Sequence, residues 1–483
     1  MIDLKEKSIQ TVRWTFLYQF ANYAITFVLS IVLARLITPT EFGLTAMVAI
    51  FISIANILIN SGFSSSLIRF KDSTPDDYST VFYFNIFISF FLYVLIFFSA
   101  PFIADFYSQP ELIPITRLIT LVFVIGSFSI IQNTILIVDL NFKKQVILSL
   151  ISLFISVVVA IILALKNYGV YSIVWQTLIQ TSVYCILLWA TSKWRPVGRF
   201  NIKSIKKLWK FSSYVFFTGI FNSIADNLDN IIIGKIFQSN TLGLFVRAKS
   251  TRGIPQNIMS SVLSTTTFSV LSKVNDNIEE FRIKHLQFYR ITIFFLIPFT
   301  IAFYWICDDF ILFFYGDKWA QAIPLLKILS IGLIPIILGI LISQSIMSFG
   351  DSKLQMQLSV VKRIIIICIL PTGFIFVMEK FMIIFVVAQY IGLVIDFYFI
   401  RNKLSTLWMD YFKPIVHPLG FSILFSIILL SFKSLEICEG YLINILVDTF
   451  IMLLIYMTLS FKFNNSEYRN FIQLIPLPKF FKK

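Results

Sequence analysis

Charge is scarce in this sequence, and residues that bind metals or form disulfides are scarcer still. Only 13% of the 483 residues are charged, against roughly a quarter in soluble domains. The two histidines, His285 and His417, lie far apart, and the four cysteines are scattered singly, so we predict neither a metal site nor a disulfide framework. The sequence also lacks a glycine-rich phosphate loop. It therefore predicts no nucleotide hydrolysis and no cofactor.

Long apolar runs take the place of these features. A membrane-spanning helix needs about 20 mostly apolar residues, and runs of that length recur from residue 14 to residue 461. A transmembrane barrel would instead alternate polar and apolar residues. The first run, residues 14–37, is too long for a signal-peptide core and has no small-residue cleavage site. We therefore predict an all-α membrane protein whose first span is not cleaved.

Hydropathy divides the chain into about fourteen spans, as two sets of six and a final pair. They are expected near residues 14–37, 42–68, 79–104, 114–138, 146–166 and 171–192, then 211–236, 241–270, 288–307, 321–347, 355–376 and 382–400, then 415–432 and 441–461. The predicted domains are an N-terminal six-helix lobe (1–192), a basic cytoplasmic linker (193–210), a C-terminal six-helix lobe (211–400), two additional helices (401–461) and a cytoplasmic tail (462–483).

Two short patterns each occur twice. Residues 34–44 read ARLITPTEFGL and residues 234–244 read GKIFQSNTLGL; we call these the turn motifs. Residues 113–121 read IPITRLITL and residues 323–331 read IPLLKILSI; we call these the proline motifs. The offsets, about 200 and about 210 residues, favour an internal repeat over chance matches, which remain the alternative. Two similar halves that rock about a central site are typical of carriers.

Lysine and arginine are unevenly distributed between the two sides of the predicted bundle. An even number of spans puts both termini on one side, and most of the 40 Lys and Arg fall there. This bias predicts cytoplasmic termini, and it explains the net charge of +15 without nucleic acid. Three of the basic residues are assigned to the inside of a span instead: Arg247, Lys249 and Arg252. The opposite side holds Arg35, Arg117, Lys166, Lys235, Lys318, Lys327, Lys380 and Lys433.

The linker between the two sets of six is the most basic break in the sequence. Its stretch KSIKKLWKF is typical of a short helix on an anionic membrane surface, with Trp209 and Phe211 as interfacial anchors. A partner-binding surface is the alternative interpretation.

Ionisable residues inside a span are functional candidates, because each costs several kcal/mol unless it pairs or faces water. They gather in the seventh and eighth spans. A turn near Gln238 would bring Asn230 level with Arg247, and Asp226 level with Arg252. One interpretation is that the acidic and basic side chains of these two adjacent helices simply neutralise each other inside the bundle. The other is binding of a phosphate or pyrophosphate by the surplus positive charge. The seventh span carries Asn222, Asp226, Asn227, Asp229 and Asn230, of which all but Asn227 share one helical face.

The corresponding spans of the first half are polar without being charged. Asn56 and Asn60 lie on the second span beside several serines. Such side chains commonly form hydrogen bonds between packed helices. The functional alternative is a wall that faces a sugar.

At residues 34–43 and 227–249 the chain resembles the O-antigen, colanic-acid and teichuronic-acid type of polysaccharide exporter. These Wzx-like proteins belong to the multidrug, oligosaccharidyl-lipid and polysaccharide exporter (MOP) superfamily, and the resemblance extends over most of the chain. It implies a MATE-like fold of two six-helix lobes around a cationic cavity. It also implies a flippase that moves an undecaprenyl-diphosphate-linked oligosaccharide across the cytoplasmic membrane for cell-surface polysaccharide or lipopolysaccharide.

The same resemblance implies roles for individual residues. Arg247, Lys249 and Arg252 match the arginines thought to hold the diphosphate. Asp226 and Asp229 are candidate ion-coupling groups. The first half lacks the central arginines of the peptidoglycan-precursor branch, which argues against lipid II as substrate.

The function predicted from these residues is alternating-access transport rather than catalysis. The expected partners are the lipid-linked oligosaccharide and membrane lipids, with a polymerase complex and a coupling cation, H⁺ or Na⁺, left open. Short outer loops disfavour a membrane polymerase or glycosyltransferase. The positive surplus disfavours a drug or organic-cation antiporter of the same superfamily. A scaffold for envelope synthesis is a further alternative.

Overall fold

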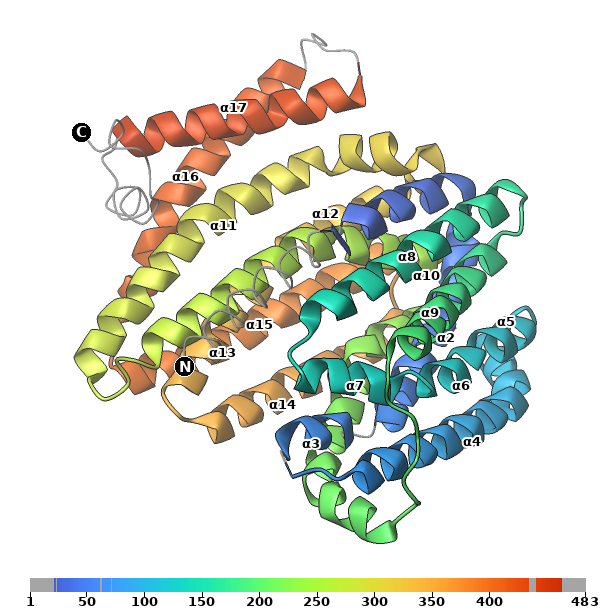
Figure 1. The fold of residues 1–483 in the computed structure, drawn as a ribbon. Coiled ribbons are helices and arrows are strands. Elements are labelled where there is room, and N and C mark those ends of the chain that lie inside the picture. Colours follow the sequence, from blue (N-terminus) through green and yellow to red (C-terminus); the bar gives the residue numbers. More distant parts are fainter. Residues whose placement is uncertain (1–20, 23, 61–62, 71, 434–439, 463–483) are drawn as a thin grey trace. The chain divides into compact units, whose positions relative to one another are not determined.

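The computed structural model describes residues 21–22, 24–60, 63–70, 72–433 and 440–462, and helix is their only regular secondary structure (Figure 1). The predicted all-α class is therefore confirmed. The chain forms two compact units, Met1–Gly243 and Leu244–Lys483. The predicted lobe boundaries stay a prediction.

In the first unit, α8 packs along α9, and α4 packs against α2, α5 and α6. Leu29, Leu33 and Ile37 form a buried cluster with Ala160 and Ala164. The small alanines let the helices of this cluster approach closely. The unit contains a helix over Ala24–Leu36, α2 (Pro39–Asn60), α3 (Phe63–Arg69), α4 (Pro75–Tyr107), α5 (Leu112–Ile119), α6 (Leu121–Ser127), α7 (Ile130–Val138), α8 (Phe142–Leu165), α9 (Val170–Thr191) and the first part of α10 (Ile202–Leu271).

In the second unit, α16 and α17 pack against the long helix α11, as Figure 1 shows. His285 lies in the core between three helices. Its Nδ1 is 2.9 Å from Ser345 Oγ, and its Nε2 is 3.4 Å from Tyr411 Oη. The unit contains the end of α10, α11 (Ile278–Tyr315), the 3₁₀ turn η1 (Asp317–Trp319), α12 (Ala322–Ile331), α13 (Leu333–Ser348), α14 (Ser352–Ile369), the 3₁₀ turn η2 (Leu370–Phe374), α15 (Met378–Leu404), α16 (Trp408–Lys433) and α17 (Tyr441–Lys462).

Among the described residues, eight helices are long and apolar enough to cross a membrane, and nine if α5 and α6 with α7 form one span bent by 46°. The chain is therefore a multi-pass membrane protein. α10 is not among the eight, and Ala24–Leu36 and Tyr441–Met452 are shorter apolar helices. The count of fourteen spans stays a prediction.

The two proline motifs adopt the same local structure. Most of each motif lies on a short helix, α5 or α12, and a single residue separates that helix from the next one. The basic residue of each motif also lies over an aromatic ring of the preceding long helix. Arg117 is 4.3 Å from the Phe97 ring centroid, and Lys327 is 5.4 Å from that of Tyr304. The sequence similarity of these motifs is thus matched by a structural one.

The turn predicted near Gln238 is also present. α10 is interrupted there, because Gln238 has φ 67° and ψ 175°, values outside the helical region. This break separates the segments predicted as the seventh and eighth spans.

Candidate functional site

One candidate region, in the first unit, is a close-packed seam between α2 and the first part of α10, which we call the α2–α10 seam. A Cβ added at Gly219 would lie 3.0 Å from the Ile57 side chain, and one added at Gly234 would lie 3.3 Å from Met47. The two helices run antiparallel, because the contacts move forward along α10 as they move backward along α2. Small residues at such contacts let membrane helices approach closely.

A short chain of hydrogen bonds, which we call the polar ladder, lies in the middle of this seam. Ser223 Oγ donates to Ser53 Oγ at 2.9 Å. The Asn227 amide donates to the Ser223 carbonyl at 2.9 Å and to Ser53 Oγ at 3.4 Å. The Asn230 amide in turn donates to Asn227 Oδ1 at 3.4 Å. The ladder thus joins the two polar segments singled out in the sequence.

The functional face of α10 predicted from the sequence includes one member of this ladder, Asn230. Ser223 and Asn227 are the members that it missed, although their spacing of four residues indicates a common face. Asn222 and Asn56, which were predicted to bind substrate, have exposed side chains. Asp229 is partly buried, and its Oδ1 accepts from the following backbone N–H at 2.9 Å. The side chains of Asn60 and Asp226 lie outside the described part of the structure.

A second candidate region, considered by itself, is the cationic stretch of α10 in the second unit. Arg247 is only 4% exposed. Its guanidinium carbon lies 4.7 Å from the Tyr315 ring centroid and 4.9 Å from that of Trp319. Thr251, one turn further along α10, lies 3.1 Å from Tyr315 Oη. Arg247 therefore fixes α10 to the end of α11 through cation–π stacking, an arrangement that the sequence did not predict.

The other two cations of this stretch have different environments. Arg252 is 7% exposed, whereas Lys249 is half-buried and lies 5.7 Å from the Phe245 ring centroid. The stretch therefore brings two buried guanidinium groups and one more accessible ammonium group together within two helical turns. The predicted pairing of Asp226 with Arg252, and of Asn230 with Arg247, stays a prediction.

The sequence analysis overlooked a further intramembrane ion pair in the second unit. Lys362 Nζ lies 2.7 Å from Asp396 Oδ2, and Asp396 is 2% exposed. Lys362 and Arg363 both fall inside the candidate span Ser352–Phe374. The assignment of only three basic residues to the inside of spans was therefore wrong. Hydropathy averaging hid the two adjacent charges, because the surrounding residues are strongly apolar.

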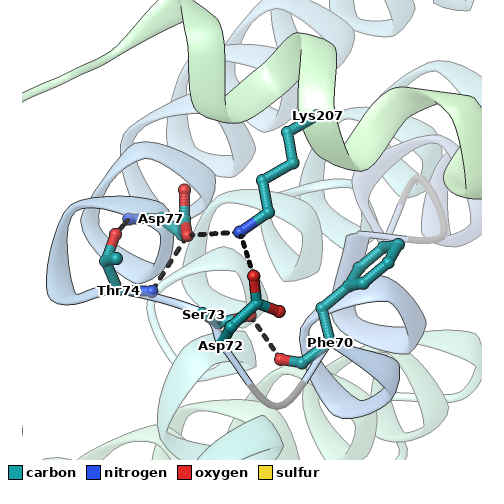
Figure 2. Close-up of polar contacts among 6 residues, drawn as sticks. All are labelled: Phe70, Asp72, Ser73, Thr74, Asp77 and Lys207. Atoms are coloured by element: carbon teal, nitrogen blue, oxygen red, sulfur yellow. Dashed lines mark hydrogen bonds and ion pairs between the residues drawn. The ribbon is translucent and has the colours of Figure 1, made fainter.

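At its start, α10 is tied to the loop that precedes α4. The Lys207 ammonium lies between two carboxylates, 3.3 Å from Asp72 Oδ2 and 3.5 Å from Asp77 Oδ2 (Figure 2). Asp77 also forms a capping box with Thr74 at the start of α4. The hydrogen bond that Lys207 donates to Asp72 raises the pKa of the Lys207 ammonium above the usual lysine value. The predicted linker is thus anchored by charge at this point.

The fold resembles that of solved transporter structures. The lipid II flippase MurJ in an inward closed conformation superposes with a TM-score of 0.73 at 16% identity, covering 95% of this chain and 100% of that one. An inward-facing MATE-family multidrug transporter of the MOP superfamily gives 0.62 at 14% identity, covering 79% and 94%. Together with the apolar helices and their buried cations, this similarity defines a membrane protein with the MOP transporter fold.

Sequence comparisons narrow this class to a family. The model of the polysaccharide biosynthesis protein family matches residues 32–324, more than half of the chain, and the protein belongs to that family. Teichuronic acid biosynthesis protein TuaB of Bacillus subtilis is 26% identical over 337 residues, 68% of this chain and 69% of that protein. Lipopolysaccharide biosynthesis protein WzxC of Escherichia coli is 20% identical over 332 residues, 68% of each chain.

Proposed function

We propose that this protein is a flippase that moves a lipid-linked oligosaccharide repeat unit from the cytoplasmic to the outer leaflet of the cytoplasmic membrane. The family match over residues 32–324 carries this proposal, because it joins a polysaccharide biosynthesis family to a transporter fold. The names of two relatives, in teichuronic acid and lipopolysaccharide biosynthesis, agree with such a substrate. The lipid carrier is an undecaprenyl diphosphate, and both termini lie in the cytoplasm.

The cationic stretch of α10 provides the chemistry for the diphosphate. Arg247 and Arg252 are buried in an apolar helical protein, where a guanidinium binds phosphate oxygens more strongly than it would in water. Lys249 is more accessible and provides an additional point charge. Asp226 and Asp229 are the coupling groups of this proposal. The protein performs no bond-breaking step. It exposes one polar site to each side of the membrane in turn.

The proposal is tested in proteoliposomes loaded with a fluorescent polyprenyl-diphosphate oligosaccharide. A membrane-impermeant quencher reports how much of the lipid reaches the outer leaflet. We expect rapid exchange with the wild-type protein and at least a tenfold slower rate with Arg252→Ala. Arg282→Ala is the matched control, because Arg282 pairs with Glu279 on an exposed helical surface. An equal rate with and without protein would refute the flippase function. Export of organic cations in place of the lipid would support the antiporter instead.

A further inference from the structure

The second unit contains a polar cavity that is separate from the cationic stretch of α10. It lies between α13, α14 and α15, and its volume is about 250 Å³. Its polar lining consists of Ser343, Gln355, Lys362, Gln389 and Asp396. All three helices are candidate membrane spans, so these groups belong to apolar segments long enough to cross a membrane. Polar groups inside such segments face protein or a water-filled space.

The charged groups of the cavity neutralise each other. Lys362 and Asp396 are in direct contact at 2.7 Å, and no other described residue of the lining is ionisable. A metal cation would meet the Lys362 ammonium beside the one carboxylate. A phosphate would meet that carboxylate beside the one ammonium. The cavity therefore favours a neutral occupant over an ion of either sign.

The hydrogen-bonding groups of the cavity are incompletely used. An ammonium group has three N–H donors, and Lys362 uses one of them on Asp396. The Lys362 side chain is 27% exposed, so its other donors are within reach of a ligand. Gln355 and Gln389 line the same cavity, and their side-chain amides carry both hydrogen-bond donors and acceptors. An occupant that both accepts and donates hydrogen bonds would satisfy these groups.

The remaining lining is apolar, and two glycines shape it. Ile336, Ile340 and Leu393 provide a hydrophobic surface beside the polar groups. A Cβ at Gly392 would come within 3.0 Å of the Lys362 side chain, so this glycine makes room for the lysine. A Cβ at Gly339 would lie 3.5 Å from Asp396 Oδ2, an ordinary contact. A methyl group at Gly339 would therefore fit beside the ion pair, and a larger side chain there would extend into the cavity.

From these features we propose that the cavity binds one neutral, hydroxyl-rich sugar ring of the transported glycan. Hydroxyl groups accept from Lys362 and form hydrogen bonds with the side-chain amides of Gln355 and Gln389, while the C–H face of the ring packs on the isoleucines and Leu393. The cavity is smaller than the roughly 300–1,000 Å³ of sites for drug-sized ligands, which suits a single ring. This inference rests on the proposed function, because the glycan supplies the sugar.

Binding is measured by saturation-transfer NMR on the full-length protein in lipid nanodiscs. The probes are methyl glucoside, methyl galactoside and methyl N-acetylglucosaminide, with glucose 6-phosphate and choline as charged comparisons. We expect a signal from at least one neutral glycoside, and at least a fivefold weaker signal in both Gly339→Leu and Gln389→Leu. Gly253→Leu is the matched control, because a Cβ there meets nothing within 4 Å. Thermal unfolding of each variant shows whether the fold is retained.

Two results would overturn the inference. One is the absence of signal from all neutral glycosides. The other is a signal that persists unchanged in Gly339→Leu and Gln389→Leu variants that remain folded. The proteoliposome assay separates this failure from failure of the proposed function. Lipid movement that continues without glycoside binding would leave the flippase intact and remove only the sugar site.

Discussion

Gly43 and Gly243 hold equivalent positions in the two turn motifs, and each packs against the backbone of the other motif. A Cβ added at Gly43 would clash with the backbone of Ser239, and one added at Gly243 would clash with that of Pro39. Pro39 and Ser239 are themselves equivalent positions. The contact is therefore reciprocal, as at a two-fold axis, where residue i meets j and j meets i.

Bulk at either glycine should disrupt this contact. We expect Gly43→Ala and Gly243→Ala each to destabilise the protein by about 1–3 kcal/mol, because neither backbone can yield to a new methyl group without shifting. Thermal unfolding in detergent, followed by tryptophan fluorescence, measures the change. Gly253→Ala is the control, and should be neutral or slightly stabilising because that helical glycine has open space around it. Equal melting temperatures for all three variants would contradict the close contact.

Arg247 should contribute to stability through its aromatic contacts as well as through its charge. Arg247→Lys keeps the charge but loses the planar stacking on Tyr315 and Trp319. We expect it to cost about 0.5–2 kcal/mol of unfolding free energy. A double-mutant cycle with Trp319→Leu isolates the pair, and a coupling energy near zero would mean that the rings merely lie nearby.

Lys362 and Asp396 should be far more sensitive to single than to paired replacement. Asp396→Leu or Lys362→Met alone leaves one charge unpaired inside the protein, at a cost of about 3–5 kcal/mol. Replacing both by these apolar residues removes that penalty, so we expect the double variant to unfold at close to the wild-type temperature. A double variant whose destabilisation equals the sum of the two single losses would show that the two residues act independently.

The contact between Asp351 and Lys403 should make stability depend on pH. A hydrogen bond from Lys403, at 2.5 Å, is the main reason that the pKa of Asp351 lies below its usual value of 3.8. The resulting stabilisation is complete above that value and is lost as the pH falls through the lowered pKa. Lys403→Met should therefore lower the melting temperature slightly at pH 7 and not at pH 2. Lys353→Met is the control, because Lys353 influences Asp351 only weakly through charge. A pH-independent effect of Lys403→Met would contradict this linkage.

Part of the site was predictable because its signals are local. The break at Gln238 and the repeat of the proline motifs depend on neighbouring residues, so short patterns reveal them. The stacking of Arg247 on Tyr315 and Trp319 joins residues that are distant in the sequence. No spacing within one helix could indicate it. The contact of Asn227 with Ser53 could not be predicted for the same reason, since Ser53 lies on α2.

The sequence by itself determined the membrane environment, the helical class and the repeated motifs, because each follows from composition and short-range periodicity along one chain. Only the tertiary structure decided which polar groups meet. It brought Ser53 to Ser223, placed Lys362 against Asp396 and fitted Gly43 against the backbone of Ser239. These pairings depend on how helices rotate and slide against one another to fill space, and a hydropathy profile of single helices contains no information on that rotation.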